Sequence, residues 1–338
     1  MSSTMNKIIN DPKNYVREMM EGICLAHPDQ VKMLDDDFRV LVRSEPAPDK
    51  VGIVTAGGSG HLPLFLGYVG EGMLDGCAVG DVFASPSAEK MTKMIKACDT
   101  GKGVLLLFGN YGGDKMNFAM AREEAEFEDI EIAELHGADD VASAALDKKE
   151  TRRGVAGIVY AYKIAGAAAD AGYDLHQVEA VTARALDQIR TMGVALTPCI
   201  VPTVGKPTFT IEEGKMEIGM GIHGEAGIDV SDILSADEVA DLTFQRINEE
   251  LKLQKGDHVS IMVNGLGATP LDEQYIVYRR LALTAEEMGL KVILPHIGEY
   301  ATSMEMSGLS VSVIKLDEEL ENLLKAPART PFYTNANM

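Results

Sequence analysis

The stretch Val51-Gly-Ile-Val-Thr-Ala-Gly-Gly-Ser-Gly-His-Leu-Pro63 decides the fold of this chain. A short apolar run that leads into glycines predicts a buried strand followed by a loop. The loop carries Ser59 and His61, and glycines such as Gly58 and Gly60 allow backbone N–H groups to approach a ligand closely. In open α/β sheets ligands bind beyond the carboxyl ends of the strands, so we expect these four loop residues to contact a substrate.

Three well-known glycine motifs do not fit this loop. A dinucleotide-binding fingerprint needs a third glycine where Pro63 stands, and a P-loop needs a Gly-Lys pair followed by a hydroxyl residue. The Gly-Lys pairs of this chain lack that residue: Gly101-Lys102, Gly205-Lys206 and Gly214-Lys215. A serine-hydrolase elbow needs glycine at the position of His61, because a side chain there crowds the turn. We therefore expect no nucleotide motif, and we expect Ser59 to donate a hydrogen bond to a ligand.

A second strand-to-loop transition spans Val104-Leu-Leu-Leu-Phe-Gly-Asn-Tyr-Gly-Gly-Asp-Lys-Met-Asn-Phe118. The apolar strand ends near Gly109, and Asp114 follows at the start of an expected helix. As an N-cap, Asp114 would satisfy an orphan backbone N–H group. Because it also follows a buried strand, it could reach the same crevice as His61. Capping and catalysis are both open from these residues alone.

His223 lies in the glycine-rich run Ile218-Gly-Met-Gly-Ile-His-Gly-Glu-Ala-Gly-Ile-Asp229. The flanking glycines remove the bulk that would normally bury an imidazole, so a small ligand could touch the ring. A neutral imidazole is nucleophilic and can add to a ketone without first losing a proton. A solvent-facing histidine in a glycine-rich turn is the alternative interpretation.

Apolar strands and amphipathic helices alternate along the chain, which predicts an α/β fold with a mostly parallel sheet in its first part. Strands are expected at residues 51–55, 104–108, 130–135, 199–203, 215–222, 258–263, 291–295 and 310–316. Helices are expected at residues 88–98, 115–128, 153–171, 175–192, 236–253 and 271–288, after a first helix that Asp11-Pro12 begins. We place one boundary near Gly193, which gives α/β domains of residues 1–192 and 193–338. His223 would then face His61 and Asp114 in an interdomain cleft.

Composition narrows the function classes. The chain has 338 residues, 46% of them hydrophobic, with 6% aromatic residues and a net charge of -21. That charge makes nucleic acid and anionic membranes unfavourable partners, because both would be repelled. The start Met1-Ser-Ser-Thr lacks an apolar signal region, no apolar run reaches about 18 residues, and the four cysteines form no Cys-x-x-Cys motif. We expect a cytoplasmic protein without a membrane span and without a metal site.

Seven motifs in order carry a family resemblance that covers nearly the whole chain. They are Thr55-Ala-Gly-Gly-Ser-Gly-His-Leu-Pro63, Gly80-Asp-Val-Phe-Ala-Ser-Pro86, Asn110-Tyr-Gly-Gly-Asp114, Arg152-Arg-Gly-Val-Ala156, Val201-Pro-Thr-Val-Gly-Lys-Pro207, Gly221-Ile-His-Gly-Glu225 and Val263-Asn-Gly-Leu-Gly-Ala-Thr-Pro270. Through them the chain resembles the substrate-binding K subunit of dihydroxyacetone kinases. Seven ordered motifs are far more specific than one glycine loop.

The resemblance implies a role for each candidate residue. In that family the histidine at the position of His223 binds the ketone carbonyl covalently as a hemiaminal. The carboxylate at Asp114 acts on the terminal hydroxyl, and the histidine at His61 assists by hydrogen bonding or proton transfer. A covalent hemiaminal would select ketoses and aldehydes over polyols such as glycerol. The expected substrate-binding residues are Gly58, Ser59, Gly60, His61, Gly109, Asp114 and His223.

Two positions depart from the dihydroxyacetone-specific pattern. Leu62 stands where that pattern has Glu, and Gly109 stands where it has Lys. Loss of a lysine removes a charge and a long stem, which predicts a roomier pocket that accepts a tetrulose such as erythrulose. Neither change touches the catalytic trio.

The resemblance also implies partners. We expect a homodimer that carries no cofactor and acts only with a nucleotide-binding L-type subunit, which brings ADP or ATP with magnesium. In some systems a phosphotransferase-system protein recharges the bound ADP. The alternative function is a coactivator that senses the sugar through the same covalent histidine and binds a transcription regulator. Asp114 favours the enzyme, because a sensor needs no base at the transferred hydroxyl, and a hydrolase built on Ser59 is a weaker third interpretation.

Overall fold

The computed structural model describes residues 6–35 and 37–336, so the first residues of the chain, on which the expectation of no signal region rests, lie partly outside it. The chain divides into two compact units, each discontinuous in sequence. The glycine-loop unit comprises Asn6–Gly137, Val159–Arg184 and the residues from Asn322 onward. The His223 unit comprises Ala138–Ile158 and Ala185–Glu321. The division does not follow the single boundary expected near Gly193, because that residue lies inside a paired strand.

A six-stranded sheet forms the centre of the glycine-loop unit, in the order β1-β2-β4-β3-β5-β6. The pairs β4-β3, β3-β5 and β5-β6 are parallel, whereas β1 and β2 are antiparallel additions at one edge. The strands are β1 Val31–Leu34, β2 Asp37–Arg43, β3 Gly52–Ser59, β4 Gly76–Val82, β5 Val104–Gly109 and β6 Ile132–Gly137. The predicted α/β fold with a mostly parallel first sheet is confirmed.

Helices cover this sheet because their apolar residues recur at helical spacing. In α2 the buried residues Met91, Met94, Ile95 and Cys98 lie on one face, and they pack with Phe118 of α3 and Leu106 of β5. The helical segments of this part of the chain are η1 Pro12–Asn14, α1 Tyr15–Ala26, η2 Leu66–Tyr68, α2 Ala88–Cys98, α3 Gly112–Glu126, α4 Ile158–Asp170 and α5 Leu175–Asp187. A short hairpin, β14 Ala328–Arg329 and β15 Thr334–Asn335, follows near the C-terminal end.

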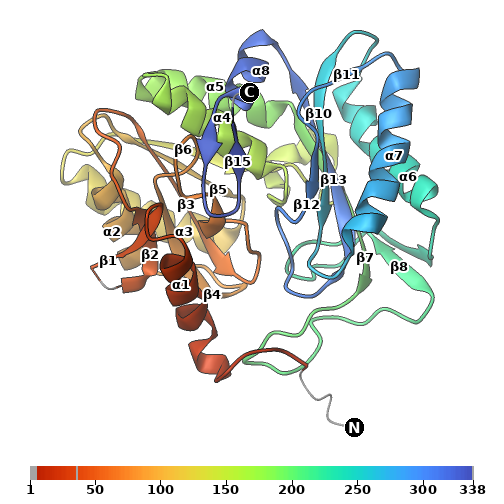
Figure 1. Ribbon diagram of the computed structural model, residues 1–338, viewed down its shortest axis with the longest axis horizontal. Helices are drawn as coiled ribbons and strands as arrows, with labels where there is room; N and C mark the ends of the chain where they lie inside the picture. Colours follow the sequence, from red (N-terminus) through yellow and green to blue (C-terminus); the bar gives the residue numbers. More distant parts are fainter. Residues whose placement is uncertain (1–5, 36, 337–338) are drawn as a thin grey trace. The chain divides into compact units, whose positions relative to one another are not determined.

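The sheet of the His223 unit is mixed, in the order β11-β10-β13-β7-β8-β9 with β12 also paired to β10. Helices α6 and α7 pack against it, as Figure 1 shows, and their buried residues join Val259, Ile261 and Val311 in one core. The elements are η3 Leu146–Thr151, β7 Ile189–Thr197, β8 Lys215–Ile218, β9 Asp229–Asp232, α6 Ala236–Leu251, β10 His258–Gly265, α7 Leu271–Glu287, β11 Lys291–Val292, β12 His296–Gly298, β13 Ser307–Leu316 and α8 Glu318–Lys325. Within the described residues no helix is long and apolar enough to cross a membrane.

Two predicted elements are wrong. The helix expected over residues 175–192 ends at Asp187, and Ile189–Thr197 forms strand β7, because pairing with β13 and β8 satisfies its backbone groups. The strand expected over residues 199–203 is a loop with one isolated bridge, Ile200 to Pro207. β-branched residues in β7 and a proline at position 202 are local signals that agree with the structure.

Candidate functional site

The glycine loop at the carboxyl end of β3 is built by close packing. A Cβ atom at Gly57 would lie 2.2 Å from the ring of Phe65, and one at Gly58 would lie 2.6 Å from the backbone nitrogen of Ala84. Gly60 has a φ of +95°, which favours glycine. The backbone N–H of Phe83 donates to the carbonyl oxygen of Ser59 at 3.0 Å. The Gly80–Pro86 motif therefore packs directly against the Gly57–His61 loop.

His61 is completely buried in this loop. Its imidazole stacks on the ring of Phe83, with centroids 4.8 Å apart, and meets Phe65 edge-on at 6.1 Å. The stacking fixes the plane of the imidazole. The two ring nitrogens of His61 can then hold or move a proton only within that plane.

Ser59 is the residue of the loop with an unused polar group. Its hydroxyl is buried, and within the described residues it has no hydrogen-bond partner. Buried hydroxyls are normally paired with protein or water, so this one is suited to a ligand oxygen. The expected role of Ser59 as a hydrogen-bond donor to a ligand stays a prediction.

Asp114 lies in the first turn of α3, not at its N-cap. The N-cap position is Tyr111, whose side chain makes no capping hydrogen bond, so the interpretation of Asp114 as a cap is wrong. The side chain of Asp114 is buried, and its negative charge adds to the larger effect of burial in raising the pKa of the Cys77 thiol on β4. A carboxylate inside a helix N-terminus is stabilised by the helix dipole.

Strands β3 and β5 bring these groups to one edge. They are adjacent and parallel, with Ile53 opposite Leu105, so their carboxyl ends point the same way. Ser59 ends β3, Gly109 ends β5, and Asp114 follows three residues into the next helix. The structure therefore places the strand ends Ser59 and Gly109, the loop residue His61 and the helix residue Asp114 at the same edge of one sheet.

His223 lies in the other unit, in a turn after β8. The backbone N–H of Gly221 donates to the carbonyl of Glu225 at 3.0 Å and closes the turn, and the Ser303 hydroxyl donates to the carbonyl of Ile222. The His223 side chain keeps 22% of its surface exposed. The glycines leave the ring accessible, as expected.

Glu225 holds the imidazole of His223 through two contacts. One carboxylate oxygen is 2.8 Å from Nδ1, and the other accepts the backbone N–H of His223 at 2.9 Å. Burial raises the pKa of Glu225, but the hydrogen bond and charge of His223 outweigh burial and bring that pKa to about 2. An ionised carboxylate only accepts hydrogen bonds, so Nδ1 carries the proton. In the neutral ring the lone pair is then on Nε2.

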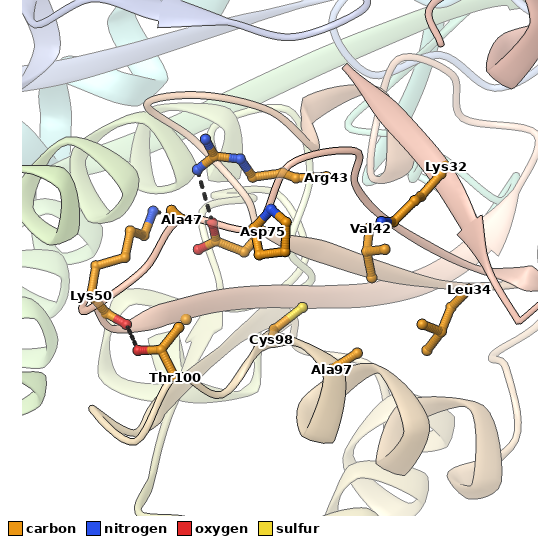
Figure 2. Close-up of a pocket in the computed structure, with 12 residues that line it drawn as sticks. Lys32, Leu34, Val42, Arg43, Ala47, Lys50, Asp75, Ala97, Cys98 and Thr100 are labelled. Carbon is orange, nitrogen blue, oxygen red and sulfur yellow. Dashed lines mark hydrogen bonds and ion pairs between the residues drawn. The ribbon is translucent and has the colours of Figure 1, made fainter. Parts of the chain in front are cut away.

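A cavity with charged lining residues lies elsewhere in the glycine-loop unit. It has a volume of about 140 Å³ and is lined by Gly52, at the start of β3, and by Cys98 (Figure 2). Lys50 Nζ lies 3.1 Å from Asp75 and 2.8 Å from Asp170 beside it. These contacts form a buried ion cluster at the amino ends of the strands, and no expected site residue lines the cavity.

Comparisons with known proteins agree on the family. Residues 21–332 match the Dak1 domain. The chain belongs to the Dak1 family. It is 43% identical over 327 residues to the dihydroxyacetone-binding subunit DhaK of the PTS-dependent dihydroxyacetone kinase 1 of Listeria innocua, covering 96% of this chain and 99% of that one.

Two other similar proteins differ from that subunit. An L-erythrulose kinase of Pectobacterium atrosepticum is 41% identical to this chain. The match covers 99% of this chain but only 57% of the erythrulose kinase. The solved structure of the dihydroxyacetone kinase operon co-activator Dha-DhaQ is 32% identical with a TM-score of 0.86, covering 92% of this chain and 96% of that one. The suspected resemblance to the K subunit, with its erythrulose option, is confirmed.

The sequence interpretation missed three residues that shape this Dak1 site. Glu225 was quoted within a motif but given no role, although a carboxylate two residues after a candidate histidine is a usable signal. Phe83, which stacks on His61, has no such signal, because the stacking depends on how two loops meet. Arg153 is the third, and its contacts are described below. Within the described residues no group of three His, Cys, Asp or Glu side chains could hold a metal ion.

Proposed function

We propose that this chain is the ketose-binding subunit of a dihydroxyacetone-type kinase. The observation that carries the proposal is the contact of His223 Nδ1 with Glu225, which leaves the lone pair of the neutral ring on Nε2. Nε2 attacks the carbonyl carbon of the ketose, and the carbonyl π electrons move to oxygen. The ring, now positively charged, loses its Nδ1 proton past Glu225 to water, and the alkoxide takes one proton from water, so that no net proton is gained or lost. The product is a neutral hemiaminal, and a polyol without a carbonyl cannot form it.

The other side chains have roles in phosphoryl transfer. Asp114 accepts the proton of the terminal hydroxyl, and that oxygen attacks the phosphorus of a nucleotide held by a separate L-type subunit. The covalent bond keeps the hydroxyl in place, which is the proximity effect on which phosphoryl transfer depends. Ser59 donates a hydrogen bond to a substrate oxygen, and His61 assists the proton transfer. This proposal requires His223 to meet Asp114 and His61 in one interdomain cleft.

Dihydroxyacetone and erythrulose are the proposed substrates. The positions of Leu62 and Gly109 favour the larger tetrulose, and the similarity to an L-erythrulose kinase supports it. The L-type subunit carries ADP or ATP with magnesium, and the PTS-dependent relative supports a phosphotransferase-system donor. The four cysteines are free thiols, which supports a reducing cytoplasm.

A sugar-sensing coactivator is the second candidate function. The similarity to Dha-DhaQ favours it, since that protein is a co-activator of comparable length. The buried carboxylate of Asp114 favours the kinase, because a sensor needs the carbonyl trap but no base. The two functions differ in whether an L-type subunit gives turnover.

We also propose a homodimer. Strand β9 is at the edge of its sheet, and Ile228, Val230 and Ile233 beside and within it are more than half exposed. An edge strand with exposed apolar residues is a surface that a second copy can cover. Light scattering measures the mass, and a monomer at micromolar concentration would overturn the dimer.

Intact-protein mass spectrometry tests the covalent step. After brief incubation with dihydroxyacetone or erythrulose, without a reducing agent, we expect the mass of the protein to increase by one sugar. Fragmentation should locate the added mass at His223, and glycerol should give no increase. A crystal soaked at neutral pH that holds the sugar without a bond to the imidazole would refute the hemiaminal.

A further inference from the structure

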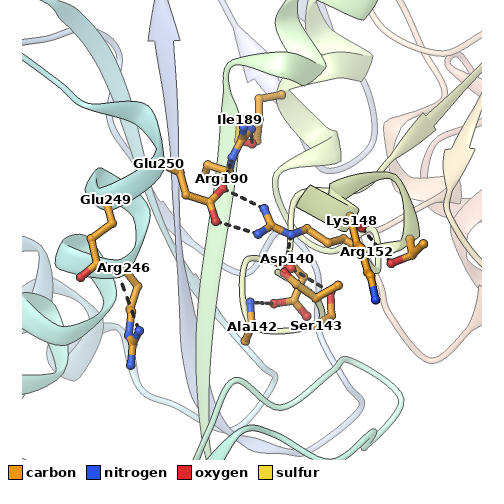
Figure 3. A network of polar contacts seen from close by, with 12 residues as sticks. Asp140, Ala142, Ser143, Lys148, Arg152, Ile189, Arg190, Arg246, Glu249 and Glu250 are labelled. Atoms are coloured by element: carbon orange, nitrogen blue, oxygen red, sulfur yellow. Dashed lines mark hydrogen bonds and ion pairs between the residues drawn. The ribbon is translucent and has the colours of Figure 1, made fainter. Parts of the chain in front are cut away.

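The motif Arg152-Arg-Gly-Val-Ala156 has no role in the site described so far. Its two arginines point to different partners. Arg152 is 1% exposed and makes a bidentate contact with Glu250, at 2.7 and 2.8 Å, which Arg190 also joins (Figure 3). This triad ties η3 to α6 and β7.

Arg153 instead reaches the segment that leads to His223. Its Nε donates to Asp140 at 2.8 Å, and its Nη2 donates to the carbonyl oxygen of Gly219 at 2.9 Å. Asp140 is 2% exposed and is fixed in turn by the backbone N–H of Ala142. The guanidinium therefore connects a rigid buried carboxylate to the first residue after β8.

Gly221 brings Arg153 close to the partner of the imidazole. A Cβ atom at Gly221 would lie 2.1 Å from a carboxylate oxygen of Glu225 and 2.6 Å from Nη1 of Arg153. Both charged groups thus contact the same glycine. The guanidinium of Arg153 therefore borders the same glycine as the carboxylate that holds His223 Nδ1.

We infer that Arg153, anchored by Asp140, is a positioning residue for His223. It fixes the carbonyl of Gly219, and its guanidinium borders Gly221 beside Glu225, so that the turn holds Glu225 against Nδ1 and leaves the lone pair of the neutral ring on Nε2. A lysine retains the charge but cannot bind Asp140 and Gly219 with one planar fork. The inference rests on the proposed function for its catalytic consequence, but not for its effect on the imidazole.

The experiment compares Arg153→Lys with the neighbouring control Arg152→Lys. Nitrogen-15 NMR of the histidine side chains, without sugar, reports which nitrogen of His223 carries the proton. We expect the wild type and Arg152→Lys to hold the Nδ1–H form and Arg153→Lys to give a mixture. The rate of sugar adduct formation should fall roughly 10-fold to 100-fold in Arg153→Lys, as expected for a misplaced reacting group. In Arg152→Lys the rate should be within twofold of wild type, with a larger loss of thermal stability.

Other outcomes separate this inference from the proposed function. An Arg153→Lys variant with the wild-type tautomer and adduct rate overturns the inference and leaves the proposed function intact. A wild type that forms no adduct overturns the proposed function, and the NMR comparison still decides the inference. If Arg153→Lys does not fold, Asp140→Asn keeps the arginine but weakens its anchor. In that variant an unchanged tautomer overturns the inference, and a mixture supports it.

Discussion

His61 and His223 are the same residue type in opposite surroundings. His61 is completely buried and stacks on Phe83 at the edge of a parallel sheet. His223 is 22% exposed in a glycine-rich turn, and Glu225 holds its Nδ1. Packing fixes one ring and a carboxylate fixes the other, and only a carboxylate also selects which nitrogen carries the proton. Accessibility and a fixed tautomer are what suit His223, and not His61, to the proposed role of nucleophile.

The largest expected effect separates the two histidines directly. His223→Ala should abolish the sugar adduct, because no other accessible imidazole has this carboxylate partner in the proposed site. His61→Asn should retain the adduct, because the buried ring assists but does not bond to the carbonyl. Mass spectrometry of both variants with erythrulose measures this. Loss of the adduct in both variants, or its survival in His223→Ala, would contradict the division of roles.

The second effect concerns Asp114, which shares the edge of the sheet with His61. Asp114→Asn should leave the adduct at His223 nearly intact while turnover with the partner subunit falls by roughly 10² or more, the usual contribution of a positioned base. Because Tyr111 holds the N-cap position, the substitution removes no cap, and loss of the interaction with the helix dipole costs about 0.3–1 kcal/mol of stability. Adduct formation and turnover are measured on one preparation with nucleotide and partner in excess. Near-normal turnover would eliminate the base.

Periodicity and motifs predicted much of this molecule. The helix at residues 88–98 has the predicted bounds, and strand β5 extends its prediction by one residue, because unbroken apolar runs and helical spacing are local signals. Strands β1, β2 and β4 were not foreseen. Their stability comes from pairing with residues distant in sequence, such as Val40 with Ala78, which no local pattern encodes.

The site was predictable at the level of residue identity. The glycine motif placed His61 correctly in the loop after β3, since a loop that follows a buried strand is a sequence property, whereas the strand runs on to Ser59. The helix position of Asp114 was wrong by three residues, because the helix begins at Gly112, a poor helix former. Whether His223 meets Ser59, His61 and Asp114 depends on how the two discontinuous units assemble. The interdomain cleft therefore stays a prediction.

The third effect concerns packing in the glycine loop. It compares a glycine packed against a neighbouring ring with a helix glycine that has free space around it. Gly57→Ala should lower the free energy of unfolding by about 1–3 kcal/mol, because the new Cβ would overlap the ring of Phe65. Gly22→Ala is the matched control. Gly22 lies inside α1 with nothing within 4 Å of its added Cβ, so that substitution should stabilise the protein by about 0.5–1 kcal/mol. Urea unfolding of the two variants measures both, and a neutral Gly57→Ala would show that the loop can relax.

The smallest expected effect is the pH dependence of folding stability that comes from the pair of Glu225 and His223. Burial raises the pKa of Glu225, but His223 outweighs it and lowers that pKa from its ordinary 4.5 to about 2. A carboxyl group whose pKa is lower in the folded state stabilises the protein above its ordinary pKa, and this contribution is lost as the pH falls from about 4.5 through about 2. Since 35% of the Glu225 side chain is exposed, solvent screening limits the contribution to about 1 kcal/mol or less.

Urea unfolding of the wild type and Glu225→Gln between pH 7 and pH 3 checks this expectation. The difference in unfolding free energy between the two proteins should shrink as the pH falls below about 5, because only the wild type takes up the extra proton on unfolding. At His223 the same substitution replaces a charged acceptor by a neutral amide, so the tautomer preference weakens and the adduct forms more slowly at every pH. A difference that grows toward pH 3 would mean that Glu225 is a strained carboxylate. The ring of His223 would then be held by packing, as the ring of His61 is.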